Sequence, residues 1–397
     1  MKSNNLLVIS NDFPNADNKY VREIFVKEQI MFLKEYFENI YVVSPIAIGM
    51  EFLRKTHYEN YRFENIHVYF PKYFNCPLFF KYCRDGWIYF EEKAIQKLIR
   101  AESLQFDLIH AHFTWHSGAV AVKVKEKYNV PLVITEHTSQ TFTDAIEKKE
   151  TQFIRSWNLC DAIIRVRKGD IPLFERVGIP LDKVYYIPNG YSHKSFLNLD
   201  SQNSRKQLGL PSNIKIILNV GNLYDEAKGH KYLIEAMNIV IKQRKDVLCF
   251  IVGGGILETK LKKQILSTGL GDYIKLVGSK PYTEIPLWMN ACDVFVLPSL
   301  SEGNPTVMFE CLGCGKPFVG TKVGGVPEII VSDDYGLLSE PGDPNELAKN
   351  ILSSLDTSWD TKKIKEYSIQ FTWGVVGKKI LKVYSKIGAT SLRLCVD

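Results

Sequence analysis

Short apolar segments that alternate with amphipathic stretches are the feature that most constrains the fold of this chain. In the first half they occur at Leu6–Ser10, Ile40–Ser44, Phe106–His110, Leu132–Thr135, Ala162–Val166 and Val184–Ile187. Helical patterns lie between them, at about 20–37 and at Ser117–Tyr128. Buried strands that alternate with helices indicate a parallel sheet covered on both faces, with ligands at the carboxyl ends of the strands. We therefore expect an α/β fold.

A second series of the same kind follows. Its strands are expected at Ile214–Val220, Leu248–Val252, Ile274–Val277, Val294–Leu297 and Phe318–Thr321, and its helices at His230–Val240, about Pro305–Leu312, and Pro344–Leu355. Residues 191–213, rich in Ser, Asn, Asp and Pro, have the composition of a linker. The chain has 397 residues, of which 45% are hydrophobic, enough for two domains. We expect these domains at 1–190 and 214–373.

The segment 294–330 carries most of the chemistry. Asn304 and Pro305 form a helix start signal, with Asn as the N-cap and Pro in the first helical position. A helix N-terminus favours a phosphate or diphosphate. Glu302 lies in the loop just before this helix, and Glu310 lies about two turns inside it. The arrangement offers donors for a diphosphate and acceptors for sugar and ribose hydroxyls, as a nucleotide-sugar requires.

Two glutamates at this spacing occur by chance in many helices, so the residues around them decide the interpretation. The order Glu302-x7-Glu310, Gly315-Lys316-Pro317, then Gly324-Gly325-Val326-Pro327-Glu328 resembles the retaining glycosyltransferases of family 4, or glycosyl transferases group 1. The resemblance implies the GT-B fold, with two Rossmann-like, doubly wound parallel-sheet domains that face a central cleft. It also implies a C-terminal helix, 374–397, that packs back on the N-terminal domain.

The loop after the strand Ile214–Val220 resembles the phosphate loop of that family, G-R-L…K-G. Asn222 replaces the usual Arg, so Lys228 would carry most of the charge at the diphosphate. The resemblance assigns donor binding to Gly221, Asn222, Lys228, Gly253, Gly278, Asn304, Pro305, Thr306 and Glu310. In this assignment Glu310 binds the ribose, Glu302 orients the sugar, and main chain near Gly278 holds the base.

The first half resembles the N-terminal domain of the family through FDLIHAHFTWHSG, VPLVITEHTS and the Pro188-Asn189-Gly190 turn. His137 matches the histidine that approaches the donor sugar from across the cleft, and His112 is a candidate acceptor-side residue. The Gly-Gly loop found after strand 1 in many members is missing, and the helix start at 25–29 resembles an FVxxQ subgroup. His110, His112 and His116 have a spacing that suggests a metal, but the family needs none. We therefore expect a metal-independent enzyme without a cofactor.

The segment Pro71–Phe90 is dense in aromatic residues, with Lys72, Lys81 and Arg84 among them. It could form an acceptor groove or a surface that touches a membrane. A buried, irregular helical region is favoured, because Glu91 and Glu92 follow at once.

Composition narrows the classes of partner and compartment. A net charge of +6 is too diffuse to indicate nucleic acid, but it is compatible with an anionic membrane surface. Of the 8 cysteines, only Cys311 and Cys314 form a tight pair, and no second pair accompanies them, so core thiols in a reducing cytoplasm are expected. The sequence shows neither a signal peptide nor an apolar run long enough to span a membrane. We expect a cytoplasmic protein, or one at the inner face of the cytoplasmic membrane.

The resemblance implies a retaining transferase that moves a sugar from a nucleotide-diphosphate-sugar to an acceptor hydroxyl. The acceptor would be a glycan or a lipid-linked glycan of cell-surface polysaccharide or glycolipid synthesis. Two alternatives remain open: a nucleotide-sugar 2-epimerase-like isomerase, and a non-catalytic nucleotide-sugar-binding module of the same fold.

Overall fold

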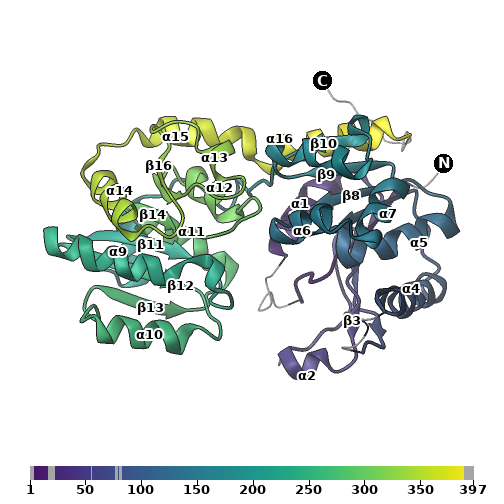
Figure 1. The fold of residues 1–397 in the computed structure, drawn as a ribbon, viewed down its shortest axis with the longest axis horizontal. Coiled ribbons are helices and arrows are strands. Elements are labelled where there is room, and N and C mark those ends of the chain that lie inside the picture. The colour runs from purple at the N-terminus through teal and green to yellow at the C-terminus, as the bar shows by residue number, and fades with distance from the viewer. Residues whose placement is uncertain (1–3, 17–22, 55, 77–78, 80–82, 389–397) are drawn as a thin grey trace. The chain divides into compact units, whose positions relative to one another are not determined.

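The computed structural model describes residues 4–16, 23–54, 56–76, 79 and 83–388. The chain folds into two compact units (Figure 1). Unit 1 comprises Met1–Pro188 with Trp373–Asp397, and unit 2 comprises Asn189–Thr372. Each unit is an α/β structure built on its own, mostly parallel sheet.

Unit 1 contains an eight-stranded sheet in the order β10-β9-β8-β7-β1-β2-β5-β4. Its strands are β1 (Asn5–Ile9), β2 (Asn39–Val43), β4 (Tyr61–Phe63), β5 (Ile66–Tyr69), β7 (Leu108–His112), β8 (Leu132–Glu136), β9 (Ala162–Arg165) and β10 (Val184–Tyr186). All neighbours pair in parallel except β4 with β5. Successive residues of β1 enter opposite cores, Leu7 and Ile9 on one face, Leu6 and Val8 on the other. A strand buried on both faces has no polar face, which is why it appears in the sequence as a continuous apolar run.

Helices cover both faces of this sheet. The helices α4 (Arg84–Ala101), α5 (Ala119–Tyr128), α6 (Gln140–Glu147) and α7 (Thr151–Leu159) pack on one face, and α1 (Ile24–Leu33) and α16 (Trp373–Lys386) on the other. The segment before α4 adds the short β3 (Ile46–Ala47), α2 (Met50–Arg54) and β6 (Lys72–Tyr73). The C-terminal helix α16 packs against α1, and the described chain ends at residue 388.

Unit 2 contains a six-stranded, all-parallel sheet in the order β13-β12-β11-β14-β15-β16. The strands are β11 (Lys215–Val220), β12 (Val247–Val252), β13 (Ile274–Gly278), β14 (Val294–Leu297), β15 (Phe318–Thr321) and β16 (Gly336–Ser339). The helices are α8 (Ser201–Leu208), α9 (His230–Gln243), α10 (Glu258–Ser267), α11 (Ile285–Ala291), α12 (Thr306–Gly313), α13 (Val326–Ile329), α14 (Pro344–Asp356) and α15 (Thr361–Ser368). The chain reverses direction across the sheet between β11 and β14. Doubly wound sheets bind ligands at the carboxyl ends of the strands at this switch point.

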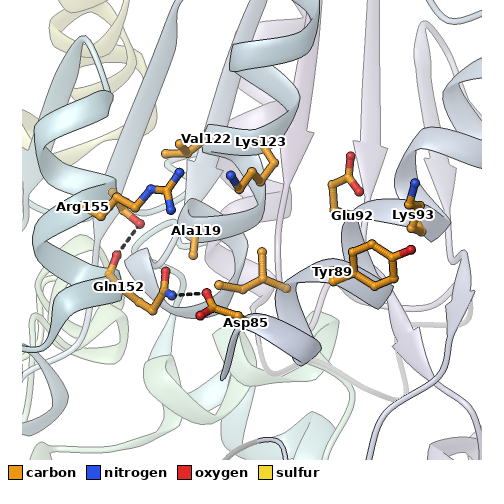
Figure 2. Close-up of a pocket in the computed structure, with 11 residues that line it drawn as sticks. Asp85, Tyr89, Glu92, Lys93, Ala119, Val122, Lys123, Gln152 and Arg155 are labelled. Atoms are coloured by element: carbon orange, nitrogen blue, oxygen red, sulfur yellow. Dashed lines mark hydrogen bonds between the residues drawn. The ribbon is translucent and has the colours of Figure 1, made fainter. Parts of the chain in front are cut away.

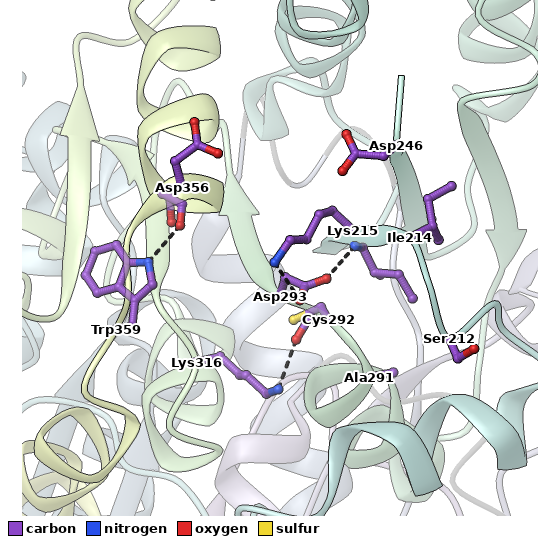
Figure 3. Close-up of polar contacts among 12 residues, drawn as sticks. Ser212, Ile214, Lys215, Asp246, Ala291, Cys292, Asp293, Lys316, Asp356 and Trp359 are labelled. Atoms are coloured by element: carbon purple, nitrogen blue, oxygen red, sulfur yellow. Dashed lines mark hydrogen bonds and ion pairs between the residues drawn. The ribbon is translucent and has the colours of Figure 1, made fainter. Parts of the chain in front are cut away.

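The segment 191–213 differs from the expected linker, because it belongs to unit 2 and contains α8. Arg205 of α8 is buried, and its guanidinium donates hydrogen bonds to the carbonyl oxygens of Ala291, Ser212 and Ile214. It also forms an ion pair of 2.7 Å with Asp293. Figure 3 shows Asp293 among the polar contacts of this region. These bonds offset the cost of burying the charge, and they fix the segment to the sheet.

The aromatic segment 71–90 is partly exposed, as a groove or membrane-touching surface would be, and partly buried, as an irregular helical region would be. Residues 77–78 and 80–82, including Lys81, lie outside the described residues. Among the others, Tyr73 is buried, while Phe74 and Tyr89 are exposed. The rings of Phe79 and Phe90 stack with centroids 5.8 Å apart. The described part of this segment is therefore a half-buried edge of unit 1, and it becomes regular helix only at Arg84.

Candidate functional site

The loops that follow β11 and β14 meet at the switch point of unit 2. The backbone N–H of Leu300 donates to the carbonyl of Ala227 over 2.6 Å. Gly229 has φ of +67°, and a Cβ atom at this position would lie 1.9 Å from the carbonyl oxygen of Pro298. Glycine favours this conformation, and the approach leaves no room for a Cβ atom. The two loops are therefore held against each other through main chain.

Side chains of these two loops form an ion pair at this point. Lys228 Nζ lies 2.8 Å and 3.0 Å from the two carboxylate oxygens of Glu302. Ser299 Oγ donates a further hydrogen bond of 2.7 Å to Glu302. The Glu302 side chain is 7% exposed and that of Lys228 is 28% exposed. The residues predicted to contact the diphosphate and the sugar thus contact each other.

Glu310 is buried and lies on α12, more than one turn after the start of the helix at Thr306. The phenolic O–H of Tyr282 donates to Glu310 Oε1 over 3.0 Å. Tyr282 follows β13 and was not identified from the sequence, because nothing local distinguishes it from other loop tyrosines. A carboxylate held in this way keeps acceptor capacity for a diol.

The predicted helix cap at Asn304 is wrong. The N-cap of α12 is Pro305, and no side chain caps it. Asn304 Oδ1 instead accepts from the backbone N–H of Asn189 over 2.8 Å, and Asn189 Nδ2 donates to the carbonyl of Asn304 over 2.7 Å. The competing long-range amide pair takes the oxygen that a cap would use. Thr306 remains at the start of the helix, as predicted.

Glycines bring the ends of β11, β12 and β13 together. A Cβ atom on Gly253 would lie 1.8 Å from the carbonyl oxygen of Gly221, and the N–H of Gly253 donates to the carbonyl of Gly278 over 3.0 Å. Asn222 Oδ1 accepts a long hydrogen bond of 3.4 Å from the N–H of Tyr224. The three glycines assigned to the donor therefore lie together at the carboxyl ends of neighbouring strands in unit 2.

His137 and His112 lie at the carboxyl ends of β8 and β7 in unit 1 and contact each other. His112 Nδ1 and His137 Nε2 are 3.0 Å apart, so one of the two carries the shared proton. Rings of Phe25 and Phe113 flank His137, with centroids 4.8 Å and 5.0 Å away. Burial, with His110 and His137 nearby, lowers the pKa of His112 well below its usual value. His112 is thus a buried partner of His137 and has no exposed surface to offer an acceptor.

The three histidines with metal-like spacing take separate partners. His110 is hydrogen-bonded to Tyr384 and Thr135, and His116 to Glu91. Within the described part of the chain, no group of three or more His, Cys, Asp or Glu side chains could hold a metal ion.

Comparison with known proteins identifies the family. Residues 200–371 match the model of glycosyl transferases group 1, and residues 54–194 match that of glycosyltransferase family 4. An uncharacterised glycosyltransferase of Methanocaldococcus jannaschii is 27% identical over 346 residues, which cover 86% of this chain and 90% of the relative. A D-inositol 3-phosphate glycosyltransferase of Corynebacterium diphtheriae is 24% identical, over 76% of each chain.

This chain is a glycosyltransferase of the family 4 type.

The fold of this glycosyltransferase agrees with solved structures. Sucrose-phosphate synthase of Thermosynechococcus elongatus superimposes with a TM-score of 0.76 at 20% identity, over 97% of this chain and 99% of the other. Anabaena HepE, in complex with UDP, superimposes with a TM-score of 0.75 at 21% identity, over 96% of this chain and 100% of the other. The expected GT-B fold, with two parallel-sheet α/β domains, is thereby confirmed.

The cysteine pair of the glycosyltransferase is part of its core. Cys311 and Cys314 are free and buried, and burial raises the pKa of both thiols. A thiol held protonated is a poor metal ligand and a poor nucleophile. Core packing, as predicted, accounts for both.

A separate cavity of about 400 Å³ lies on unit 1, between α4, α5 and α7 (Figure 2). Charged side chains of both signs line it: Asp85, Glu92, Lys93, Lys123 and Arg155. None of the residues assigned to donor or acceptor lines this cavity. Across the described residues, no helix is long and apolar enough to cross a membrane.

Proposed function

We propose that this glycosyltransferase transfers a sugar, with retention of anomeric configuration, from a nucleotide-diphosphate-sugar to an acceptor hydroxyl. The Lys228–Glu302 ion pair at the switch point of unit 2 carries the proposal. A cation, two buried carboxylates and a helix N-terminus are the groups that a diphosphate, a sugar and a ribose require. HepE, which shares the fold, has been crystallised with UDP and with UDP-glucose.

Each group has a chemical role in this proposal. Lys228 and the N-terminus of α12 stabilise the charge that grows on the leaving diphosphate, and such preorganised charge is usually the largest catalytic effect. Glu310, oriented by Tyr282, accepts hydrogen bonds from the ribose diol. Glu302 accepts hydrogen bonds from the sugar hydroxyls and orients the ring.

Retention is proposed without an enzyme nucleophile. A double displacement would need a free carboxylate next to the anomeric carbon, whereas the Glu302 carboxylate is engaged by Lys228 and Ser299. The acceptor oxygen therefore bonds to the anomeric carbon on the face that the diphosphate leaves, and the leaving phosphate accepts the proton of the acceptor. The resemblance assigns His137 to the donor sugar and implies that no metal takes part.

The acceptor is proposed to be a glycan or a lipid-linked glycan, used in the cytoplasm or at the inner membrane face. A phosphorylated polyol is a second candidate, because several relatives are named D-inositol 3-phosphate glycosyltransferase. Neither candidate changes the donor chemistry.

Calorimetric titration with UDP, GDP and ADP tests the donor site. We expect micromolar binding of one nucleotide, weakened about 10- to 100-fold in Lys228→Ala, as for the loss of a hydrogen bond from a charged group. Lys363→Ala is the matched control, because Lys363 forms an exposed ion pair with Asp334 in the same unit. No binding of any nucleotide, or equal loss in both variants, would contradict the proposal.

Product analysis distinguishes the activities. Incubation with the matching nucleotide-sugar and an acceptor should give a glycoside with the anomeric configuration of the donor, as read by NMR. An epimerised donor formed without an acceptor would indicate the isomerase, and an inverted glycoside would exclude retention.

A further inference from the structure

His230 occupies the first position of α9, directly after the Lys228-Gly229 turn. Gly229 adopts the left-handed conformation there and serves as the N-cap, so the chain turns sharply from the loop into the helix. The imidazole of His230 is thereby placed next to the ion pair described above.

The His230 side chain is buried but unsatisfied. Only 3% of the residue is exposed, and neither Nδ1 nor Nε2 has a hydrogen-bond partner among the described residues. A neutral imidazole has one donor and one acceptor nitrogen. Buried polar atoms are nearly always paired in native proteins, and those that are not commonly mark an absent ligand or a functional site.

The unsatisfied ring edge faces the end of β11. His230 Nε2 lies 3.8 Å from the position that a Cβ atom on Gly221 would occupy. Because residue 221 is glycine, no side chain of its own fills that position, and apart from its chain neighbours no other described heavy atom lies within 4 Å of it. A ligand oxygen seated slightly closer to the ring than this position is within hydrogen-bond distance of Nε2.

Two further features make this spot suitable for an anion. It lies at the N-terminus of a helix of 14 residues, where the dipole is positive. Lys228 lies close enough to the imidazole to lower its pKa, although burial is the larger cause. A cation, a helix N-terminus and an unpaired N–H donor thus converge beside one glycine.

We propose that His230 binds the donor, with its Nε2–H donating a hydrogen bond to the diphosphate of the nucleotide-sugar. This inference rests on the proposed function and adds a residue to its leaving-group site. It also accounts for Asn222, which stands where the family has an arginine. In this chain the second side-chain donor at the diphosphate comes from α9 and replaces the one missing from the loop.

The test compares His230→Leu with the wild-type chain by calorimetry and thermal unfolding. Leucine removes the donor but keeps an apolar body, so we expect an unchanged or higher Tm, because a buried unsatisfied group is removed. Binding of UDP, GDP or ADP, whichever the wild type prefers, should weaken roughly 3- to 10-fold, as for one neutral hydrogen bond. Binding of the corresponding nucleoside, which lacks phosphate, should not change.

A second variant and a control complete the design. His230→Gln keeps an N–H donor of similar reach and should bind the nucleotide more tightly than His230→Leu. If the leucine variant does not fold, His230→Ala, which also lacks the donor, takes its place in this comparison. His57→Leu, at an exposed histidine of unit 1, should bind as the wild type does. If the wild type binds a nucleotide and neither His230 variant weakens it, the inference is overturned while the proposed function stands. If the wild type binds none of the three, both are overturned.

Discussion

The ion pair of Lys228 with Glu302 links the binding of the diphosphate to the orientation of the sugar. The ammonium of Lys228 is held by the largely buried carboxylate of Glu302. A diphosphate that binds Lys228 must therefore compete with Glu302 for the same cation, and the sugar hydroxyls must compete with Lys228 for the same carboxylate. Binding and orientation of the donor are therefore coupled at this pair. Lys228→Ala and Glu302→Gln should differ in their effects on nucleotide binding.

Glu302→Gln should separate nucleotide binding from turnover. The amide keeps the size of the side chain but no longer competes for Lys228, so binding of the nucleotide should be retained or tightened. Turnover should fall about 10- to 100-fold, as expected when a charged hydrogen-bond acceptor is lost. Initial rates and calorimetry on the same preparation measure both effects. The matched control is Glu284→Gln, because the carboxylate of Glu284 contacts Trp288. Near-normal turnover of Glu302→Gln would show that Glu302 does not orient the sugar.

Helix α12 carries Glu310, and it is closely packed three residues further along, at Gly313. A Cβ atom on Gly313 would lie 2.2 Å from the ring of Tyr191. That ring cannot easily move, because it is buried and its hydroxyl is hydrogen-bonded to Ser368 over 2.8 Å. Tertiary packing therefore reverses the usual preference for alanine over glycine in a helix.

Gly313→Ala should destabilise unit 2 by about 1–3 kcal/mol, as overpacking of a core typically does. It should also weaken nucleotide binding, since α12 must shift and carry Glu310 with it. Gly374→Ala, at an exposed position of α16, should instead be neutral or stabilising, by up to about 1 kcal/mol. Urea unfolding of both variants measures the contrast, and equal stability of the two would show that the Tyr191 ring yields.

At the scale of the whole molecule, helix α16 is joined to the sheet of unit 1 by a buried histidine, His110. His110 Nδ1 lies 2.6 Å from the hydroxyl of Tyr384 on α16, and its Nε2 lies 2.7 Å from Thr135 Oγ1 on β8. Burial lowers the pKa of His110 to about 3. The native state therefore binds a proton at His110 less strongly than the unfolded chain does. This contribution to stability is fully present above pH 6.5 and is lost as the pH falls toward 3.

His110→Gln should flatten the acid side of the stability profile. At pH 7.5 the wild type should be the more stable, and its advantage should shrink by about 1.4 kcal/mol for each pH unit below 6.5. Urea unfolding at pH 7.5, 6.0 and 5.0 measures this. His57→Gln, at an exposed histidine, should follow the wild type. Parallel profiles of wild type and His110→Gln would mean that His110 does not stay neutral in the native state.

The elements that could be predicted are those whose signal is local. The strands predicted at Val294–Leu297 and Phe318–Thr321 occur there, because a short, largely apolar segment next to a Pro or a Gly turn suffices to indicate a buried strand. The short, half-exposed strand β4 and its partner β5 could not be predicted, because the region before α4 has only a weak hydrophobic pattern. The polar composition of segment 191–213 predicts a linker, and nothing in it indicates that Arg205 is buried.

In the candidate site, too, the features with a local sequence signal can be predicted and the long-range contacts cannot. Lys228, Glu302 and Glu310 can be assigned from the sequence, because the glycine and proline pattern around them is local. Three other features become visible only in the folded domain: the contact of Lys228 with Glu302 across 74 positions, the pairing of Asn304 with Asn189, and the absence of a partner for His230 among the described residues. Such contacts depend on which strands are neighbours in the sheet. Strand order follows from the packing of the whole domain, and no stretch of sequence encodes it alone.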